Sequence, residues 1–521
     1  MNHFIAPTKG AARPLAELRR FLWSFFSLFT LVWVLLPLAA NQTLNRDTIQ
    51  ILYWGREGQW GYFKHPPLIS WIAEALYRLS GPHDAVFYLA SLIIVLAAFL
   101  AIHRLASAFL APWPAAMAVT SLTVLGFYSY LVPNLNHNIL VLLPWAMILL
   151  TTYRAMEERR RSAWLWLGLW FGIGILTKYT VLMLSPLILA HMLAEPRHRR
   201  LVLHPGPWLA MAIGLLVSGP HLIWLAQNEF MPLFYIQSGA GIAEPISAQD
   251  HLINPLISLG KMLGMGAPAV GLLWLSLGRP RWQGHGHSSA DRFLLTMGLG
   301  PPGLVLVLSA VSGAEMRNEW AMPFFLILPI LLMRHGFAVP DPAHIRRFLV
   351  GLTSLSVAMA VTYLLIFSGV ISVSEEEEWA QFPARDAAAA MERGWSDACG
   401  AKPLPIIVGD SWLAGTASYL LPGQPRVYTE ADSRMAPWVT DRMVGESGAL
   451  IVWNKDRPAQ FRDLDHQDED ENEEPRDWFP GLPALAARFG PITALHDAVL
   501  PYGGIVPQPP VHLGLAVVCP R

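Results

Sequence analysis

NRDTIQILYWGREGQWGYFKHPPL, residues 45–68, follows the first strongly apolar stretch of the chain. Acidic and basic side chains stand here beside aromatic residues, and the segment ends in a Pro-Pro pair before Leu68. The runs on both sides, 21–40 and 85–103, are apolar and long enough to cross a bilayer. We therefore expect the chemistry of the protein to lie in this polar segment at a membrane surface.

Composition places the whole chain among membrane proteins. Of 521 residues, 53% are hydrophobic and only 14% are charged, with a mean hydropathy of +0.38. The net charge of −1 gives no basic excess, which excludes nucleic acid as an expected partner. The basic N-terminus and the long first apolar run favour a retained first helix over a cleaved signal peptide.

The distribution of arginines predicts how the spans are oriented. An odd number of spans, about 11, puts the two termini on opposite sides of the membrane. Arginines crowd the loops predicted on the N-terminal side, whereas the opposite loops at 133–137, 227–255 and 313–319 contain only Arg317. The positive-inside rule then puts the N-terminus in the cytoplasm. The predicted spans are 21–40, 85–103, 113–132, 138–153, 163–177, 179–194, 207–226, 256–277, 292–312, 320–334 and 347–372.

Two long loops fall on the outer, periplasmic side. The loop 41–84 is predicted to form two short interfacial helices, over 47–57 and 67–79, because the second carries apolar residues at helical spacing. The loop 227–255 is rich in glycine and proline, which indicates a segment that lines or closes a cavity. Residues 1–372 thus form a predicted transmembrane catalytic domain.

Residues 373–521 are predicted to form a periplasmic α/β domain. Short apolar runs at 405–408, 449–453 and 513–518 alternate with helix-like and turn-like segments, which indicates four or five strands. The acidic runs at 375–378 and 463–475 are interpreted as solvated loops. Cys399 and Cys519 either form a disulfide, as the compartment permits, or remain two buried thiols.

Asp47 is the first candidate for chemistry, because an acid at a partly apolar membrane surface would make a good general base. The alternative is that Asn45 or Asp47 caps the following helix. Lys64 and His65 precede the Pro-Pro pair, which holds them in a stiff turn suited to phosphate. Contact with lipid headgroups is the alternative for this cationic pair.

Other polar groups fall on the same predicted face. The loop 133–138 carries Asn136 and His137, together with Asn138, which would either cap the next helix or face a cavity. Lys178 breaks the positive-inside pattern, either to meet an anion or by snorkelling. Arg317 suits a phosphate or carboxylate, or pairs with a neighbouring glutamate. No nucleotide-binding loop, nucleophile elbow or metal-ligand spacing is found, so an activated lipid would have to supply the energy.

The segment 45–68 resembles the first outer loop of the dolichyl-phosphate-mannose protein mannosyltransferase superfamily, which includes the bacterial lipid A aminoarabinose transferases. Members read DE, then a tyrosine-tryptophan stretch, then GYF-D-HPPL. Asp47 has the expected offset from Gly61, while Thr48 replaces the second acid and Lys64 replaces an acid before His65. The resemblance covers about 1–335 and extends through NLNHNILVLLPWA, LTKYT, GPHLIWLAQNEFMPLFY and NEWAMPFFLILPILL.

The resemblance implies an all-α polytopic membrane protein of the GT-C fold with a C-terminal α/β periplasmic domain. It implies an inverting glycosyltransferase that moves a sugar from a polyprenyl-phosphate donor to an envelope glycolipid, polysaccharide or protein. Asp47 would be the base. No cofactor other than the donor and no metal ligands are predicted, although Thr48 leaves dependence on a divalent metal open. The donor phosphate would be bound by His65, Lys64, Lys178 and Arg317, and the sugar or acceptor pocket would contain Asn136, His137, Asn138 and Tyr62.

Two alternatives remain at this point. One is a transporter of lipid-linked sugars or small solutes, although the chain shows no inverted repeat. The other is a catalytically inactive relative that binds a lipid-linked glycan, which the threonine at position 48 keeps open.

Overall fold

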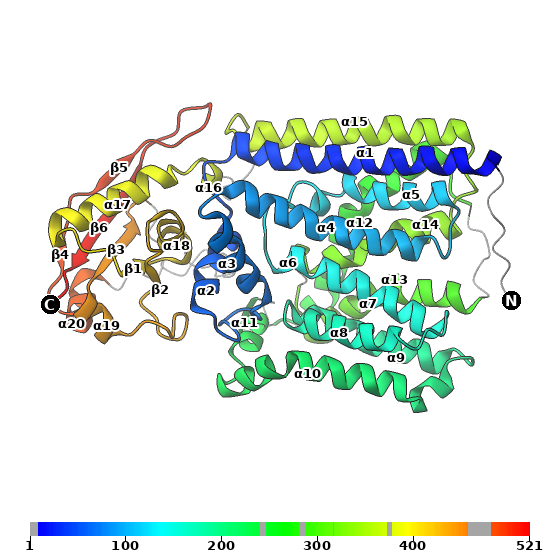
Figure 1. Cartoon of the computed structure of the whole chain (residues 1–521), viewed down its shortest axis with the longest axis horizontal. Coiled ribbons are helices and arrows are strands. Elements are labelled where there is room, and N and C mark those ends of the chain that lie inside the picture. Colours follow the sequence, from blue (N-terminus) through cyan, green and yellow to red (C-terminus); the bar gives the residue numbers. More distant parts are fainter. Residues whose placement is uncertain (1–8, 240–245, 282–287, 316, 372–377, 457–480) are drawn as a thin grey trace.

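A computed structural model describes residues 9–239, 246–281, 288–315, 317–371, 378–456 and 481–521. The helices form an elongated bundle, and a smaller α/β domain sits on the end of the bundle that is far from the N-terminus (Figure 1). The predicted domain boundary at 372/373 and the acidic runs at 375–378 and 463–475 lie wholly or largely outside the described residues.

Among the described residues, seven helices are long and apolar enough to cross a membrane. Each coincides with a predicted span. Their side chains include many large hydrophobic residues on the outer surface, as expected of faces in contact with lipid. The seven are α1 (Lys9–Ala40), α4 (Asp84–Ala106), α6 with α7 (His137–Leu140, Leu142–Met156), α10 (Pro205–Gln227), α12 (Asp250–Leu277), α13 (Ser289–Ser312) and α15 (Pro342–Phe367).

The other four predicted spans contain shorter or interrupted helices. Proline explains part of this, because it lacks the backbone N–H that a helix interior needs, and Pro323 lies within one 3₁₀ segment. The number of spans therefore stays a prediction. These elements are α5 with η1 and η2 (Pro112–Thr120, Ser121–Val124, Gly126–Tyr128), α8 (Ala163–Ile175), η3 with α9 (Tyr179–Met183, Leu184–Ala194), and η5 with α14 (Asn318–Leu326, Leu328–His335); η4 (Arg199–Leu203) follows α9.

Helices α8 and α10 pack closely through small residues. A Cβ atom on Gly168 would lie 2.4 Å from the carbonyl oxygen of Ala210, and one on Gly172 would lie 2.5 Å from Val217 Cβ. Close approach of backbones through small residues is typical of membrane helix pairs. This contact fixes the position of α10. Near its C-terminal end, α10 carries His221 and Trp224, which contact Trp60 and Gly61.

The predicted outer helices exist with nearly the predicted bounds, as α2 (Arg46–Glu57) and α3 (Leu68–Ser80). Helix α3 fits an interfacial position, with Leu79 86% exposed on its apolar stripe. The interfacial prediction for α2 is wrong, because Thr48 to Gly55 are all buried. The C-terminal domain covers α2, which sequence periodicity cannot show. The loop 227–255 contains a further helix, α11 (Met231–Gly239).

Within its described residues, 378–456 and 481–521, the C-terminal domain contains a sheet of six strands rather than four or five. Its order is β2-β1-β3-β6-β4, with β5 also pairing with β6. Strands β1, β2 and β3 are parallel, while β6 runs antiparallel to β3. The strands are β1 (Ile406–Gly409), β2 (Arg426–Thr429), β3 (Ala449–Asn454), β4 (Thr493–Ala494), β5 (Ala498–Leu500) and β6 (Val511–Val518); the helices are α16 (Glu378–Gln381), α17 (Ala384–Cys399), α18 (Ser411–Leu420), α19 (Asp441–Ser447) and α20 (Gly481–Phe489).

A disulfide joins Cys399, at the end of α17, to Cys519, just after β6. It closes the domain by linking its first long helix to its last strand. Of the two states that the sequence left open, the structure therefore contains the bonded one.

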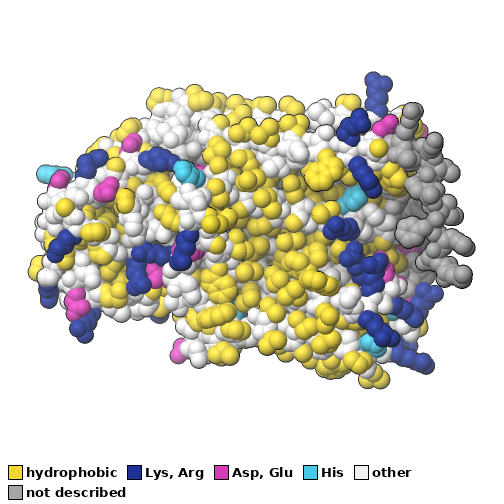
Figure 2. Space-filling view, in the orientation of Figure 1, with side chains coloured by type: hydrophobic (Ala, Val, Ile, Leu, Met, Phe, Trp, Pro, Cys, Tyr) yellow, Lys and Arg dark blue, Asp and Glu magenta, His cyan; other side chains and the backbone are white. Residues whose placement is uncertain are grey.

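Charge is distributed unevenly along the molecule. A broad belt of hydrophobic side chains covers the helix bundle, and Lys and Arg side chains gather at the end near the N-terminus (Figure 2). The C-terminal domain, at the other end, displays both signs of charge (Figure 2). We refer below to the end near the N-terminus as the basic end, and to the end that carries the C-terminal domain as the outer end.

Candidate active site

Asp47 lies in the first turn of α2 with its side chain exposed at the outer end of the bundle. Asn45 caps the helix, since its side chain accepts a hydrogen bond of 2.9 Å from the Asp47 backbone N–H. This decides between the two capping alternatives and leaves the Asp47 carboxylate to accept a 2.9 Å hydrogen bond from Asn136 Nδ2. The partly apolar surroundings of Asp47 stay a prediction.

Thr48, the residue in place of the second acid, has a structural contact. Its side chain is completely buried, and its hydroxyl donates to the carbonyl oxygen of Leu135 at 3.1 Å. Adjacent residues of α2 therefore bind adjacent residues of the loop 133–138. A carboxylate at position 48 could not donate this hydrogen bond when ionised.

The loop 133–138 links Asp47 to a lysine. Asn136 is the N-cap of α6 and accepts from the Ile139 backbone N–H at 3.0 Å. Asn138 does not cap the helix, contrary to one alternative from the sequence; its side-chain oxygen accepts a hydrogen bond from Lys178 Nζ. Lys178 precedes η3, so it comes from a different part of the bundle.

A cluster of basic side chains surrounds His137 of this loop. The rings of His65 and His137 lie 4.0 Å apart, centroid to centroid. Lys64 is 4% exposed, and its ammonium group lies 5.0 Å from the ring centroid of Tyr235 on α11, within the range of a cation–π contact. The loop 227–255 thus contributes directly to this cluster.

The environment keeps His65 neutral in the absence of substrate. Burial is the largest cause that lowers the pKa of its imidazole well below the ordinary value of 6.5. The positive charges of Lys178 and Lys64, together with His137, lower the pKa further. An anion placed among these groups would reverse that effect, so the cluster is built to gain from binding negative charge.

The turn that holds Lys64 and His65 is fixed by several contacts. The Tyr62 backbone N–H donates to the His65 carbonyl oxygen at 3.0 Å. A Cβ atom on Gly61 would lie 2.3 Å from the Trp224 ring, so only glycine fits at this position without movement. His221 of α10 bonds the carbonyl oxygen of Trp60 through Nδ1 at 2.6 Å. Helix α10 therefore sets the position of the cationic pair.

Tyr62 lies behind the site. It is 2% exposed, its ring stacks on Trp54 at a centroid distance of 4.8 Å, and its hydroxyl donates to the Trp54 carbonyl oxygen at 2.6 Å. Its position supports the turn that holds Lys64 and His65. Pocket contact by Tyr62 stays a prediction.

Arg317 immediately precedes η5, which packs against α6. The neighbouring Glu315 forms an ion pair with Lys261 of α12. This pairing gives Glu315 a cationic partner on another helix, and Arg317 stays a predicted phosphate ligand.

The sequence did not predict the contacts between α2 and the C-terminal domain. The hydroxyl of Ser411, at the start of α18, lies 2.9 Å from the Tyr53 hydroxyl and accepts from Gln50 Nε2 at 3.0 Å. Arg426 of β2 lies 3.4 Å from Glu57 at the other end of α2. Local sequence patterns do not mark this interface, because its partners are far apart in the chain: Tyr53 and Ser411 are separated by 358 residues. The C-terminal domain thus fixes the helix that carries Asp47.

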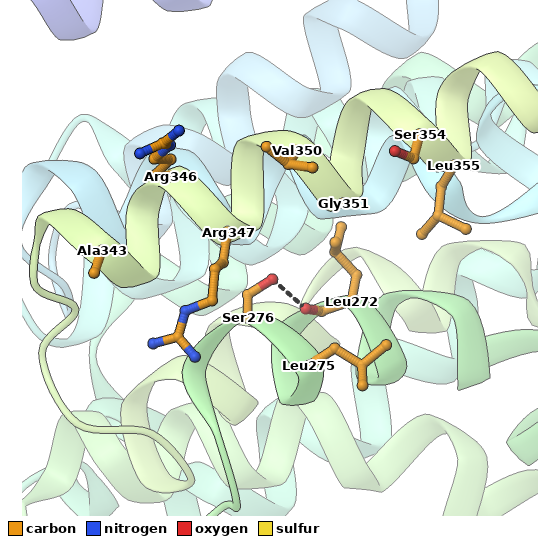
Figure 3. Close-up of a pocket in the computed structure, with 10 residues that line it drawn as sticks. All are labelled: Leu272, Leu275, Ser276, Ala343, Arg346, Arg347, Val350, Gly351, Ser354 and Leu355. Carbon is orange, nitrogen blue, oxygen red and sulfur yellow. Dashed lines mark hydrogen bonds between the residues drawn. The ribbon is translucent and has the colours of Figure 1, made fainter.

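A separate groove of about 740 Å³ lies between α12 and α15 (Figure 3). Leu272 and Leu275 line it from α12, and Val350 lines it from α15, with Arg346 and Arg347 on α15 at one end (Figure 3). Leu275 is 81% exposed, so the groove belongs to the apolar surface of the bundle. None of the residues around Asp47 contributes to it.

Comparisons with known proteins show what the chain resembles. Residues 64–224 match the family model described as dolichyl-phosphate-mannose-protein mannosyltransferase. The chain is 23% identical to the lipopolysaccharide core galacturonosyltransferase RgtA of Rhizobium johnstonii, over 87% of this chain and 89% of that protein. It is 26% identical to the undecaprenyl phosphate-alpha-4-amino-4-deoxy-L-arabinose arabinosyl transferase of Erwinia tasmaniensis, over 60% of this chain and 59% of that protein.

The fold is also similar to that of a solved glycosyltransferase structure. The crystal structure of ArnT from Cupriavidus metallidurans bound to undecaprenyl phosphate matches 95% of this chain and 98% of that one, with a TM-score of 0.60 at 13% identity. The chain is therefore similar to this superfamily of glycosyltransferases, in part of its sequence and in its fold. It is accordingly a multi-pass bacterial membrane enzyme of the glycosyltransferase class, and the transporter alternative finds no support among these relatives.

Proposed function

We propose that this glycosyltransferase moves a sugar from a polyprenyl-phosphate donor to an envelope glycolipid, with inversion at the anomeric carbon. One observation carries the proposal. The segment 136–138 joins an exposed carboxylate to a cationic cluster, since Asn136 binds Asp47 while Asn138 binds Lys178. A base and a set of phosphate ligands are what transfer from a sugar phosphate to a hydroxyl requires.

In the proposed reaction the acceptor hydroxyl attacks the anomeric carbon from the side opposite the phosphate. Asp47 takes the hydroxyl proton as the new C–O bond forms. The bond between the anomeric carbon and the phosphate oxygen breaks, and its electron pair leaves with polyprenyl phosphate. His65, Lys64 and Lys178 stabilise the charge that develops on this leaving group, with Arg317 as a further ligand. In this scheme the side-chain cations supply the positive charge without a metal.

Of the remaining predicted residues, the three in the segment 136–138 would line the space between base and phosphate. Asn136 orients the Asp47 carboxylate and presents its amide to the sugar or acceptor, while Asn138 orients Lys178. His137 lies between the two, with its ring against His65. Tyr62 shapes the turn from behind.

Two observations support a periplasmic active site. Lys and Arg side chains gather at the end of the bundle opposite to α2, the helix that contains Asp47, as the positive-inside rule requires of the cytoplasmic side (Figures 1 and 2). The disulfide lies in the domain that covers α2, and stable disulfides are typical of oxidising compartments such as the periplasm. Several relatives act on lipid A or the lipopolysaccharide core by name, which favours a glycolipid acceptor.

Mass spectrometry of envelope glycolipids tests the proposal. A strain that lacks this protein should lose one sugar from a lipid A or core species, and the wild-type gene should restore it. The purified protein should then transfer that sugar from its polyprenyl phosphate to the underglycosylated lipid, with a product of inverted anomeric configuration by NMR. An unchanged set of glycolipids, or transfer with retention, would contradict the proposal.

A further inference from the structure

Three side chains of metal-binding type meet far from Asp47, at the basic end of the bundle. Glu157 directly follows α7, His191 lies in the last turn of α9, and His198 precedes η4. Their potential ligand atoms all lie within 4.8 Å of one another. The Nε2 atom of His191 lies 4.0 Å from Glu157 Oε1, and that of His198 lies 3.6 Å from the same oxygen. The three residues are dispersed in sequence, so motif spacing did not reveal them.

Burial makes this cluster unusual. His191 is 3% exposed and His198 is 2% exposed. Within the described part of the chain, His191 Nε2 and His198 Nδ1 have no hydrogen-bond partner. Buried polar atoms nearly always have a partner, and leaving one unsatisfied is costly. The unpartnered Nε2 of His191 is also the atom that faces Glu157.

A further hydrogen bond orients the Glu157 carboxylate. Ser289, at the start of α13, donates a hydrogen bond of 2.5 Å to Glu157 Oε1. Another carboxylate, that of Glu195, forms an ion pair with Arg292. Groups that orient metal ligands in this way are typical of metal sites. The ring of Phe293 packs on His191 and closes the cluster on its apolar side.

We propose that Glu157, His191 and His198 bind a Zn²⁺ ion. Two imidazole nitrogens and one carboxylate oxygen suit zinc better than magnesium or calcium, which prefer oxygen ligands throughout. Bonds of about 2.0–2.1 Å place the ligand atoms of a tetrahedral site about 3.3 Å apart, so modest side-chain movements complete the geometry. Solvent or the second Glu157 oxygen would provide the fourth ligand. The ion would tie α7, α9 and η4 together, and Ser289 would connect α13 to them.

Metal analysis of the protein tests the site. The full-length protein, purified in detergent through a tag without histidines, is incubated with ZnCl₂ and desalted. It should retain one zinc ion per chain by mass spectrometry of the metal, as a single mononuclear site requires. The double variant His191→Ala/His198→Ala should fall to background. The control variant is His103→Ala, which changes a histidine in the last turn of α4, outside the cluster. It should retain the zinc. Background zinc in the wild type, or equal zinc in the double variant, would overturn the proposal.

Cobalt provides a readout that does not depend on how well the double variant folds. Co²⁺ added to metal-free wild-type protein should give the visible absorption bands of a four-coordinate site, and Zn²⁺ should abolish them. Zinc should also raise the thermal midpoint of the wild type but not of Glu157→Gln, because ligand binding stabilises only a folded state that holds the site. The absence of both signals would show that the cluster is a histidine–carboxylate ion pair and nothing more. Neither measurement depends on the proposed transfer reaction.

Discussion

The Asp47 carboxylate accepts a hydrogen bond of 2.9 Å from the side-chain amide of Asn136, a residue 89 positions away in the sequence. Asn136 also caps α6, and the same short loop carries Asn138 and its lysine partner. One loop thus determines the separation between the proposed base and the proposed phosphate ligands. Predictions about catalysis therefore divide between Asp47 itself, the loop and the cations.

Replacing Asp47 by asparagine should abolish proton removal and leave donor binding intact. Loss of a general base typically lowers the rate by about 10²- to 10⁴-fold, so turnover of purified Asp47→Asn should fall by at least 10²-fold. Binding of a polyprenyl-phosphate sugar should remain close to that of the wild type. Asp386→Asn, which changes another exposed acid in the first turn of an outer helix, is the control and should keep full activity. Unchanged turnover in Asp47→Asn would remove Asp47 from the mechanism.

Asn136→Asp separates the two contacts of Asn136. Aspartate is as good an N-cap as asparagine, so α6 should remain stable. It places a carboxylate where Asp47 now receives an N–H donor, so the orienting hydrogen bond is lost. A hydrogen bond to a charged group contributes about 1.5–3 kcal/mol, which corresponds to roughly a 10- to 100-fold fall in turnover.

Thermal unfolding and turnover, measured together, check this prediction. Turnover of Asn136→Asp should fall steeply, while the thermal midpoint should fall only slightly, because the cap of α6 is kept and the lost contact lies at the exposed Asp47. A lower midpoint with unchanged turnover would show that Asn136 is needed for the helix cap alone.

How far the sequence could predict this site depends on the kind of interaction. Asp47, His65 and Lys178 were predicted because local sequence and resemblance mark them individually. The cap at Asn45 was left open, since Asn45 and Asp47 both suit that position, and only the backbone geometry decides. Burial of α2 was missed because Tyr53 meets Ser411 across a separation of 358 residues, and local periodicity contains no such information. The cluster of Glu157 with two histidines was missed for the same reason.

The pH dependence of donor binding should report on His65. Burial and neighbouring cations keep the pKa of this imidazole well below 6.5 in the free protein. The donor phosphodiester keeps a fixed negative charge between pH 5 and 8 and would raise that pKa, so binding should take up a proton. Affinity should then increase as pH falls through the raised pKa, by up to about tenfold per pH unit, and level off below the pKa of the free protein.

Calorimetry with a non-hydrolysable donor analogue, in buffers of different ionisation enthalpy, measures this proton uptake directly. His65→Ala should bind more weakly and lose the proton uptake, while Asp47→Asn should retain it. Equal proton uptake in His65→Ala would assign the titration to another group, with His137 as the nearest candidate.

The contact between Gly61 and Trp224 should couple the cationic turn to α10. In Gly61→Ala the new Cβ atom would meet the Trp224 ring at 2.3 Å, and either the turn or the ring must move. Overpacking of this kind costs about 1–3 kcal/mol, and here it should appear as weaker donor binding, because the displaced turn carries Lys64 and His65.

A double-mutant cycle checks the direction of this coupling. Trp224→Leu removes the clashing ring, so the pair Gly61→Ala/Trp224→Leu should bind the donor better than the two single effects predict when added. Gly219→Ala, on the same α10 with open space at the Cβ position, is the control and should leave binding unchanged. Strict additivity would mean that the turn holds its position independently of α10, and that the hydrogen bond from His221 to Trp60 is a passive contact.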